Sequence, residues 1–188
     1  IAPGKQVVAY DQGGGAYAAR MWWMLRWLGF EAAAVLDGGY AKWAAEGRVV
    51  STEPTEPTPA TFKIQRVTPT VGATGVMASI PRQGLLILDA RAPERFRGEK
   101  EPFDPVAGHI PGAGNVPSTS LLAGDGSFLP DTDLAQLFDS QTTGVYCGSG
   151  VTASVVVAAL AATGVDAALY PGSWSEWCSD PNRPVARG

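Results

Sequence analysis

A cysteine in a glycine-rich stretch is the feature of the sequence that most clearly points to chemistry. Cys147 follows a short segment containing Val and Tyr, and precedes Gly-Ser-Gly-Val-Thr and an apolar run that ends near Gly164. This order predicts a buried strand, a tight loop and a buried helix. N–H groups of such a loop and of the first helical turn attract anions and stabilise a thiolate. We therefore expect Cys147 to be a loop-exposed nucleophile.

The residues after Cys147 are predicted to hold an anionic sulfur atom. Their backbone N–H groups would surround a thiolate and any sulfur attached to it. The hydroxyl groups of Ser149 and Thr152 either add donors or simply cap the loop. The predicted cradle consists of Gly148, Ser149, Gly150, Val151 and Thr152.

A second polar group follows the apolar segment at residues 85–88. Asp89 ends this predicted strand, and Arg91 and Arg95 come next, four residues apart and on one face if the segment is helical. A planar guanidinium matches carboxylate or sulfonate oxygens. We predict that Arg95 binds an anionic substrate. Arg91 is the second candidate, with pairing to Asp89 as its alternative role, and Asp89 is expected to orient the site.

Four motifs together resemble the rhodanese superfamily. The loop at 147–152 is similar to the active-site loop of 3-mercaptopyruvate sulfurtransferases, and the segments at 89–98, 107–113 and 171–177 agree with it in order. The resemblance implies an α/β fold with a parallel sheet flanked by helices, in two tandem domains. It also implies transfer of a sulfane sulfur from thiosulfate or 3-mercaptopyruvate to cyanide or a thiol, through a persulfide on Cys147.

The resemblance also bears on individual residues. The substrate-binding arginine of the family falls on Arg95, and the Gly-His-Ile-Pro-Gly turn makes His109 a structural residue rather than a base. Cys178 follows Trp177 and is interpreted as a packed thiol. No cluster of His, Cys and carboxylates has the spacing of metal ligands, so we expect no metal and no cofactor.

The start of the chain repeats its end. Tyr10-Asp11, an apolar helix, Gly29 and Trp43 match Tyr146-Cys147, its helix, Gly164 and Trp177 at a nearly constant interval. A carboxylate cannot accept sulfur as a thiolate does, so the first copy should be catalytically silent, as the resemblance also implies. We predict an inactive rhodanese-like part at 1–50, a linker at 51–71 and a catalytic domain at 72–188.

Several local predictions complete this division. Closely spaced prolines and glutamates at 51–59 favour an extended linker. Residues 62–67 alternate like an edge strand. A helix is predicted over 131–139, capped by Asp131 or Thr132.

The first copy is incomplete in this sequence. It has no counterpart of the strand at 85–89 or of the turn at 107–113. Half a parallel sheet exposes strand edges and apolar side chains. We therefore expect a missing N-terminal segment, packed against residues 5–45 as a separate nicked chain or replaced there by a partner molecule.

Composition narrows the expected partners. The net charge of −4 argues against nucleic acid. No run of about 18 apolar residues exists, so no membrane span is expected. A free catalytic thiol suits the reducing cytoplasm. The expected partners are a small anionic sulfur donor and a thiol or cyanide acceptor.

The donor and two rival functions stay open at this point. The neutral Gly148-Ser149 pair favours mercaptopyruvate, but Phe103-Asp104 stands where mercaptopyruvate enzymes usually have a second arginine. A cysteine phosphatase or arsenate reductase is one alternative, although its Cys-x5-Arg loop would need an arginine where Ala153 stands. The other alternative is a non-catalytic sulfur-carrier module.

Overall fold

The first part of the chain forms one small parallel sheet with two helices. The computed structural model describes residues 1–2, 4–65, 68–80, 86–139 and 141–188. The elements of this first part are β1 (Val7–Ala9), α1 (Ala16–Trp27), β2 (Ala33–Val35) and α2 (Gly39–Ala45). Strands β1 and β2 pair in parallel and make a two-stranded sheet.

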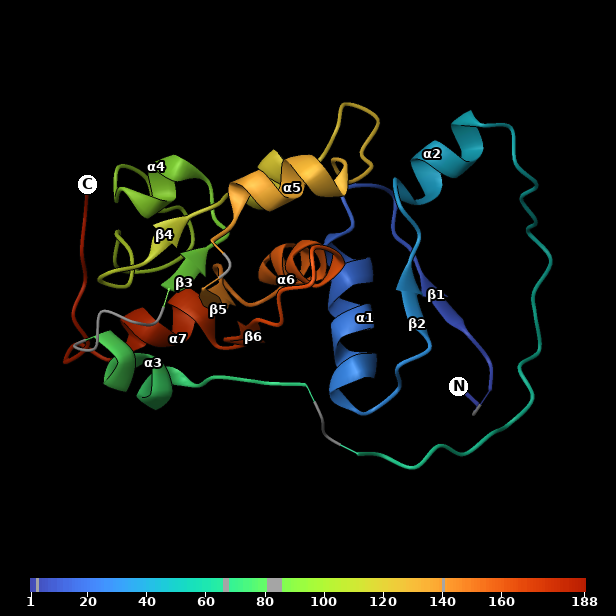
Figure 1. Cartoon of the computed structure of the whole chain (residues 1–188), viewed down its shortest axis with the longest axis horizontal. Helices are drawn as coiled ribbons and strands as arrows, with labels where there is room; N and C mark the ends of the chain where they lie inside the picture. The colour runs from blue at the N-terminus through green and yellow to red at the C-terminus, as the bar shows by residue number, and fades with distance from the viewer. Residues whose placement is uncertain (3, 66–67, 81–85, 140) are drawn as a thin grey trace.

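The second part of the chain forms a larger sheet between two layers of helices (Figure 1). Its strands are parallel and follow the order β4-β3-β5-β6, which confirms the predicted α/β class. The elements are α3 (Ala73–Ser79), β3 (Leu86–Asp89), α4 (Pro93–Phe96), β4 (Gly114–Asn115), the 3-10 helix η2 (Ser118–Leu121), α5 (Asp131–Leu137), β5 (Thr142–Tyr146), α6 (Ala153–Ala162), β6 (Ala168–Leu169) and α7 (Ser173–Ser179).

The larger sheet buries a different apolar cluster on each face. Successive strand residues point to opposite faces, so Leu88 and Ile87 belong to different clusters. The first cluster joins β3 and β5 to α6 through side chains such as Val156. The second cluster contains Trp174 and Trp177 of α7, both fully buried.

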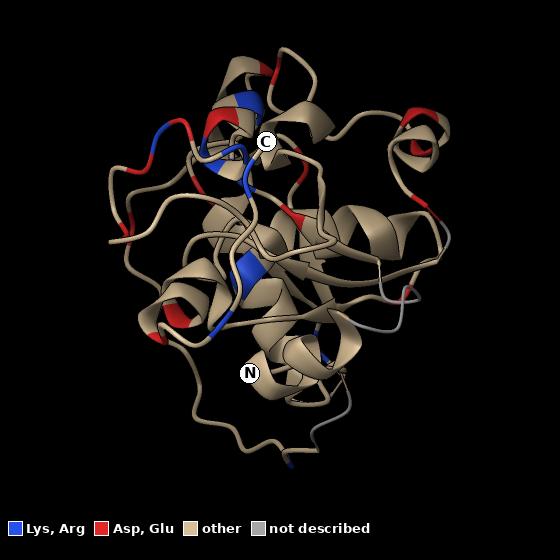
Figure 2. Cartoon of the chain, turned by 90° about the vertical axis from the view of Figure 1, so that its left-hand side faces the viewer, with Lys and Arg blue, Asp and Glu red and all other residues tan. Residues whose placement is uncertain are grey.

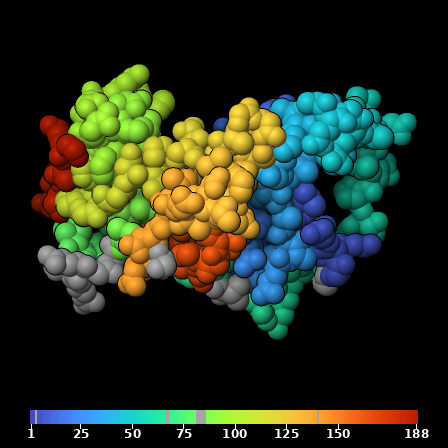
Figure 3. All heavy atoms as spheres, turned by 45° about the horizontal axis from the view of Figure 1, so that its top comes forward, coloured from blue at the N-terminus to red at the C-terminus, as the bar shows by residue number. Residues whose placement is uncertain are grey.

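Helix α1 joins the two parts of the chain by packing against α6 (Figure 1). Its Ala19 and Trp23 are buried in the same cluster as Cys147 and most of α6. Figure 3 shows the N-terminal segment, in blue, directly against the orange segments of the second part. Trp→Ala substitutions at such buried sites cost about 3–5 kcal/mol, so this contact holds the two parts together.

The linker prediction needs one correction. Residues 62–65 form no strand, and residues 66–67 lie outside the described residues. Phe62 instead packs edge-on against Phe30 with ring centroids 5.6 Å apart, and the Gln65 N–H donates to the Leu28 carbonyl at 2.8 Å. Among the apolar residues of this segment, Phe62 is anchored by this ring contact, whereas Ile64 is 59% exposed.

One predicted helix cap differs from the structure, and one predicted strand start is not tested. Helix α5 has Pro130 as its N-cap residue and no side-chain cap, so neither Asp131 nor Thr132 caps it. Asp131 is already the first helical residue, where a carboxylate favours the positive end of the helix dipole. Strand β3 begins at Leu86, and Leu85 lies outside the described residues.

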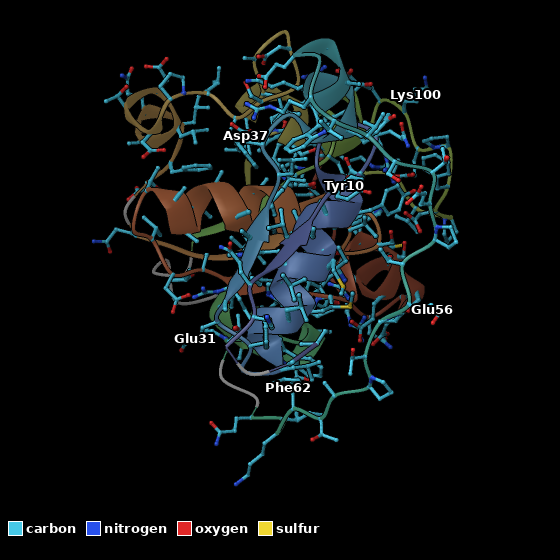
Figure 4. The ribbon with its side chains drawn as sticks, turned by 90° about the vertical axis from the view of Figure 1, so that its right-hand side faces the viewer. Tyr10, Glu31, Asp37, Glu56, Phe62 and Lys100 are labelled. Atoms are coloured by element: carbon cyan, nitrogen blue, oxygen red, sulfur yellow. The ribbon has the colours of Figure 1, made fainter. Side chains whose placement is uncertain are left out.

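One face of the small sheet is apolar and open to solvent. Val8 is 48% exposed and Tyr10 is 62% exposed. Figure 4 looks onto this pair of strands, with Tyr10 on the near side. A cavity of about 490 Å³ lies here, lined by Val8, Tyr10, Leu36, Tyr40, Trp43, Val49, Val50 and Ser51. Contiguous exposed apolar surface of this kind marks an interaction site.

Candidate active site

The predicted strand, loop and helix place Cys147 directly after β5, at the carboxyl edge of the sheet. Ligands of parallel α/β sheets bind at this edge. The cysteine is only 2% exposed, so the expectation of a loop-exposed side chain is wrong. It lies instead against an open cavity of about 300 Å³ lined by Arg95, Phe103, Asp104, Cys147, Gly148, Ser149, Val151, Thr152 and Ser175.

Gly150 brings a backbone donor to the sulfur. Its N–H lies 3.1 Å from Cys147 Sγ. Its φ of +80° is left-handed, and a Cβ here would lie 2.4 Å from the Pro171 carbonyl oxygen. Only glycine fits this position without a backbone shift.

Ser173 supports the loop from α7 and was not predicted. Its hydroxyl accepts a hydrogen bond from the Cys147 N–H at 3.1 Å and donates to the Tyr170 carbonyl at 2.8 Å. Its φ is +54°, which is rare for a residue with a side chain and is maintained mainly at functional sites. Gly39 begins α2 as Ser173 begins α7, and its φ is +61°. A glycine at the matching position of the repeat was the signal in the sequence.

Arg95 lines the cavity, and two carboxylates share its charge. Its Nη2 lies 2.6 Å from Glu101 Oε1 and 3.4 Å from Asp104 Oδ2. A Cβ at Gly148 would lie 3.3 Å from Arg95 Nη1, so this guanidinium borders the catalytic loop directly. Burial opposes ionisation of Glu101, but hydrogen bonding to Arg95 lowers the net pKa of that carboxyl.

Arg91 and Asp89 lie in the core beside the site. Arg91 precedes α4, which begins at Pro93, so the condition for a shared helical face with Arg95 is not met. Both guanidinium groups nevertheless pair with Glu101. Arg91 Nη2 lies 2.7 Å from Asp89 Oδ2, and its side chain is 1% exposed. This geometry matches the alternative in which Arg91 pairs with Asp89, and it keeps the guanidinium away from the cavity lining.

His109 and Cys178 both pack in the fold. The His109 ring stacks on Phe96 with centroids 3.8 Å apart, and its Nδ1 lies 2.8 Å from the Phe96 carbonyl oxygen. Cys178 is 7% exposed, and burial raises the pKa of its thiol. In the described part of the chain, neither residue lines the cavity beside Cys147.

One backbone hydrogen bond of the first part matches a bond at Cys147. The Cys147 carbonyl accepts from the Trp174 N–H at 3.0 Å, and the Asp11 carbonyl accepts from the Tyr40 N–H at 2.8 Å. The Asp11 carboxylate fills its own cradle. It accepts bonds of 3.0–3.2 Å from the N–H groups of Gly13, Gly15, Tyr17 and Ala18.

The wider surface carries charges of both signs. Figure 2 shows basic and acidic positions side by side on the face that carries the C-terminus. Within the described residues, His, Cys, Asp and Glu side chains form no group of three that could hold a metal ion. No helix in the described part of the chain has the length and hydropathy to cross a membrane.

These features define a rhodanese-like protein. The sequence matches the rhodanese-like domain family over residues 2–46 and 74–180. The chain belongs to this family.

Relatives of this chain carry the names of sulfurtransferases. A Mycobacterium tuberculosis protein that carries the name thiosulfate sulfurtransferase, SseB, is 47% identical over 97% of this chain and 67% of its own length. A Pseudomonas aeruginosa protein named as a 3-mercaptopyruvate sulfurtransferase is 47% identical over 98% of this chain and 68% of its own length. The solved structure of the 3-mercaptopyruvate sulfotransferase SseA from Escherichia coli is similar with a TM-score of 0.78 and 34% identity, over 91% of this chain and 67% of that one. The chain thus spans about two thirds of each relative.

Proposed function

We propose that this protein is a sulfurtransferase that carries sulfur as a persulfide on Cys147. The observation that carries the proposal is the position of its Sγ, 3.1 Å from the Gly150 N–H and against a cavity that Arg95 also lines. Membership of the rhodanese-like family and the names of the relatives support the same activity.

The reaction divides into two displacements. The Cys147 thiolate attacks the sulfane sulfur of the donor and forms a new S–S bond. The bond between that sulfur and the rest of the donor breaks, and its electron pair leaves with sulfite or with the enolate of pyruvate, which then takes up a proton. The acceptor thiolate or cyanide attacks the outer sulfur and returns Cys147 as a thiolate. The Gly150 N–H stabilises the anionic sulfur at both stages.

The charges around the cavity favour a singly charged donor. Arg95 faces the cavity, but Glu101 and Asp104 already offset its charge. Ser149 and Gly148 are neutral. A thiosulfate dianion gains little from this balance. One carboxylate can bind Arg95 Nη1, since Glu101 already binds Nε and Nη2. We propose 3-mercaptopyruvate as the better donor, thiosulfate as the weaker one, and cyanide or a small thiol as acceptor.

The first part of the chain is proposed to be a catalytically silent rhodanese-like unit at 1–50, joined through 51–71 to the catalytic domain at 72–188. Asp11 fills the cradle that Cys147 occupies in the second copy. The open apolar face of β1 and β2 supports a further proposal, that additional rhodanese-like polypeptide covers Val8 and Tyr10, in the same chain or as a nicked segment.

The activity is tested with Cys147→Ser and Cys178→Ser side by side. After incubation with donor, mass spectrometry should show one added sulfur atom on the peptide containing Cys147. Thiocyanate formation should be lost in Cys147→Ser and kept in Cys178→Ser, because Cys178 is packed away from the cavity. Thiocyanate formation by Cys147→Ser would overturn the proposal. Hydrolysis of a phosphate monoester by the wild type, without sulfur transfer, would point to the phosphatase alternative.

A further inference from the structure

Arg20 reaches the catalytic loop from the part of the chain that has no catalytic cysteine. It lies on α1, and its Nη1 donates to the Gly150 carbonyl at 3.4 Å, across 130 residues of sequence. The same Gly150 presents its N–H to Cys147 Sγ at 3.1 Å. Gly150 therefore connects Arg20 to Cys147, because its carbonyl binds the guanidinium and its N–H contacts the sulfur.

The helix holds this arginine in place. Its neighbours Ala19 and Trp23 are 0% and 3% exposed, and both belong to the cluster that contains Cys147 and α6. The Arg20 guanidinium carbon lies 4.8 Å from the centroid of the Trp23 ring, a cation–π distance. The guanidinium thus has a fixed platform and little freedom to leave the loop.

The electrostatics distinguish Arg20 from Arg95. Arg95 is paired with Glu101 and Asp104. Among the described residues, Arg20 has no carboxylate at ion-pair distance, although Glu176 of α7 lines the same groove. Burial lowers the pKa of Arg20, while the charge of Cys147 acts in the opposite direction. Arg20 and Cys147 Sγ both contact Gly150, through its carbonyl and its N–H, and this shared residue brings the cation near an anionic sulfur.

We propose that Arg20 is a positioning residue for Cys147, supplied by the silent part of the chain. It helps to fix the Gly150 carbonyl, which also accepts from the Ser154 hydroxyl at 3.3 Å, and through it the loop that faces the sulfur. Its charge favours the thiolate and the persulfide anion over their protonated forms. This gives the first part of the chain a role in the reaction of the second part. The proposal rests on the proposed function, but it concerns the reactivity of the Cys147 thiol, which can be measured without a sulfur donor.

The test compares Arg20→Gln and Arg20→Lys with Arg26→Gln. Arg26 is the matched control, because it lies on the same helix with its guanidinium carbon 5.3 Å from the Trp22 ring and lines a different groove. The readout is the rate of Cys147 alkylation by iodoacetamide from pH 5 to 10, in a Cys178→Ser background. This rate requires neither a sulfur donor nor sulfurtransferase activity.

Arg20→Gln should move the midpoint of the alkylation profile to higher pH and slow alkylation at pH 7 by about three- to tenfold, as expected for loss of one partly exposed charge-assisted contact. Arg20→Lys should show a smaller shift than Arg20→Gln, because lysine keeps the positive charge. Arg26→Gln should leave the profile unchanged.

Three outcomes would overturn the proposal. They are an unchanged midpoint in Arg20→Gln, an equal shift in Arg26→Gln, and an Arg20→Gln shift that tracks only a lower melting temperature. If the glutamine variant does not fold, the lysine variant decides. Because lysine keeps the cation, a midpoint shift in Arg20→Lys as large as that expected for loss of the charge would assign Arg20 to loop geometry and remove the charge effect. If the wild type transfers no sulfur but Arg20→Gln still shifts the alkylation profile as expected, only the proposed function is refuted and the role of Arg20 stands.

Discussion

Asp11 and Cys147 occupy the same place in two copies of one substructure. Each follows a parallel strand, and each carbonyl accepts a bond from the first turn of the helix that begins after the next strand, at Tyr40 and Trp174. The two copies differ in the group that accepts the N–H donors of the loop. A carboxylate accepts four N–H donors in the first copy, and a sulfur atom accepts the Gly150 N–H in the second. The first cradle is permanently filled by its own anion, while the second can take one from a substrate.

Arg95→Gln should lower kcat/KM for both donors by about 10- to 100-fold, because a hydrogen bond to a charged group is worth about 1.5–3 kcal/mol. Arg97→Gln is the control, since its partner is the exposed Glu99 and it does not line the cavity. Steady-state kinetics with mercaptopyruvate and thiosulfate measure the effect. Equal losses in the two variants would move the anion site away from Arg95.

Asp104→Asn should improve thiosulfate as a donor. Its carboxylate lies 3.4 Å from Arg95 Nη2 and lines the cavity, so its removal frees positive charge for a dianion. We expect kcat/KM for thiosulfate to rise about two- to fivefold, since partly exposed charge pairs are worth about 0.2–1 kcal/mol. The exposed Asp166→Asn makes the same change in net charge and should have no effect. A fall in thiosulfate activity would refute this account of donor preference.

Ser173→Ala should be more destabilising than Ser173→Gly. Both variants leave the Cys147 N–H without its hydroxyl partner, at a cost of about 1–3 kcal/mol. Glycine recovers part of this cost, about 1 kcal/mol, because it adopts the left-handed φ of +54° without strain. Urea unfolding compares the variants, with Ser175→Ala as a control whose exposed hydroxyl bonds to the Gly148 carbonyl. The reverse order would show that the backbone here is unstrained.

Asp125→Asn should weaken the contact between the two parts of the chain in a pH-dependent way. Hydrogen bonds from the Ser127 hydroxyl and from Lys42 lower the pKa of Asp125, and Lys42 lies on α2 at 2.9 Å. The stabilisation is complete above the unfolded carboxyl pKa of about 3.9 and declines as the pH falls below it. The unfolding midpoints of wild type and variant should therefore differ at pH 6 and approach each other below about pH 4. A constant difference across this range would exclude ionisation of Asp125 as the cause.

Local patterns in the sequence predicted most of the frame of the site. The apolar runs before and after Cys147 gave β5 and α6, and the match of Tyr10-Asp11 with Tyr146-Cys147 gave the repeat. These features depend on neighbouring residues, whose periodicity and glycine content can be read directly.

The contacts that complete the site depend on tertiary structure. Ser173 reaches Cys147 from 26 residues away, and Arg20 reaches Gly150 from 130 residues away. The spacing of Arg91 and Arg95 misled for a related reason. A shared face required a helix through both, whereas Pro93 begins α4 and leaves Arg91 in the core.

The packing of α1 on α6 has a consequence during synthesis of the protein. Residues around Arg20 leave the ribosome roughly 130 residues before those around Gly150. At about 5–20 residues per second, this interval is on the order of ten seconds. For that time Trp23, which is 3% exposed in the folded protein, has no α6 to cover it. The nascent chain therefore presents an aromatic surface that a chaperone can bind, and the first part of the chain cannot complete its packing before α6 is made.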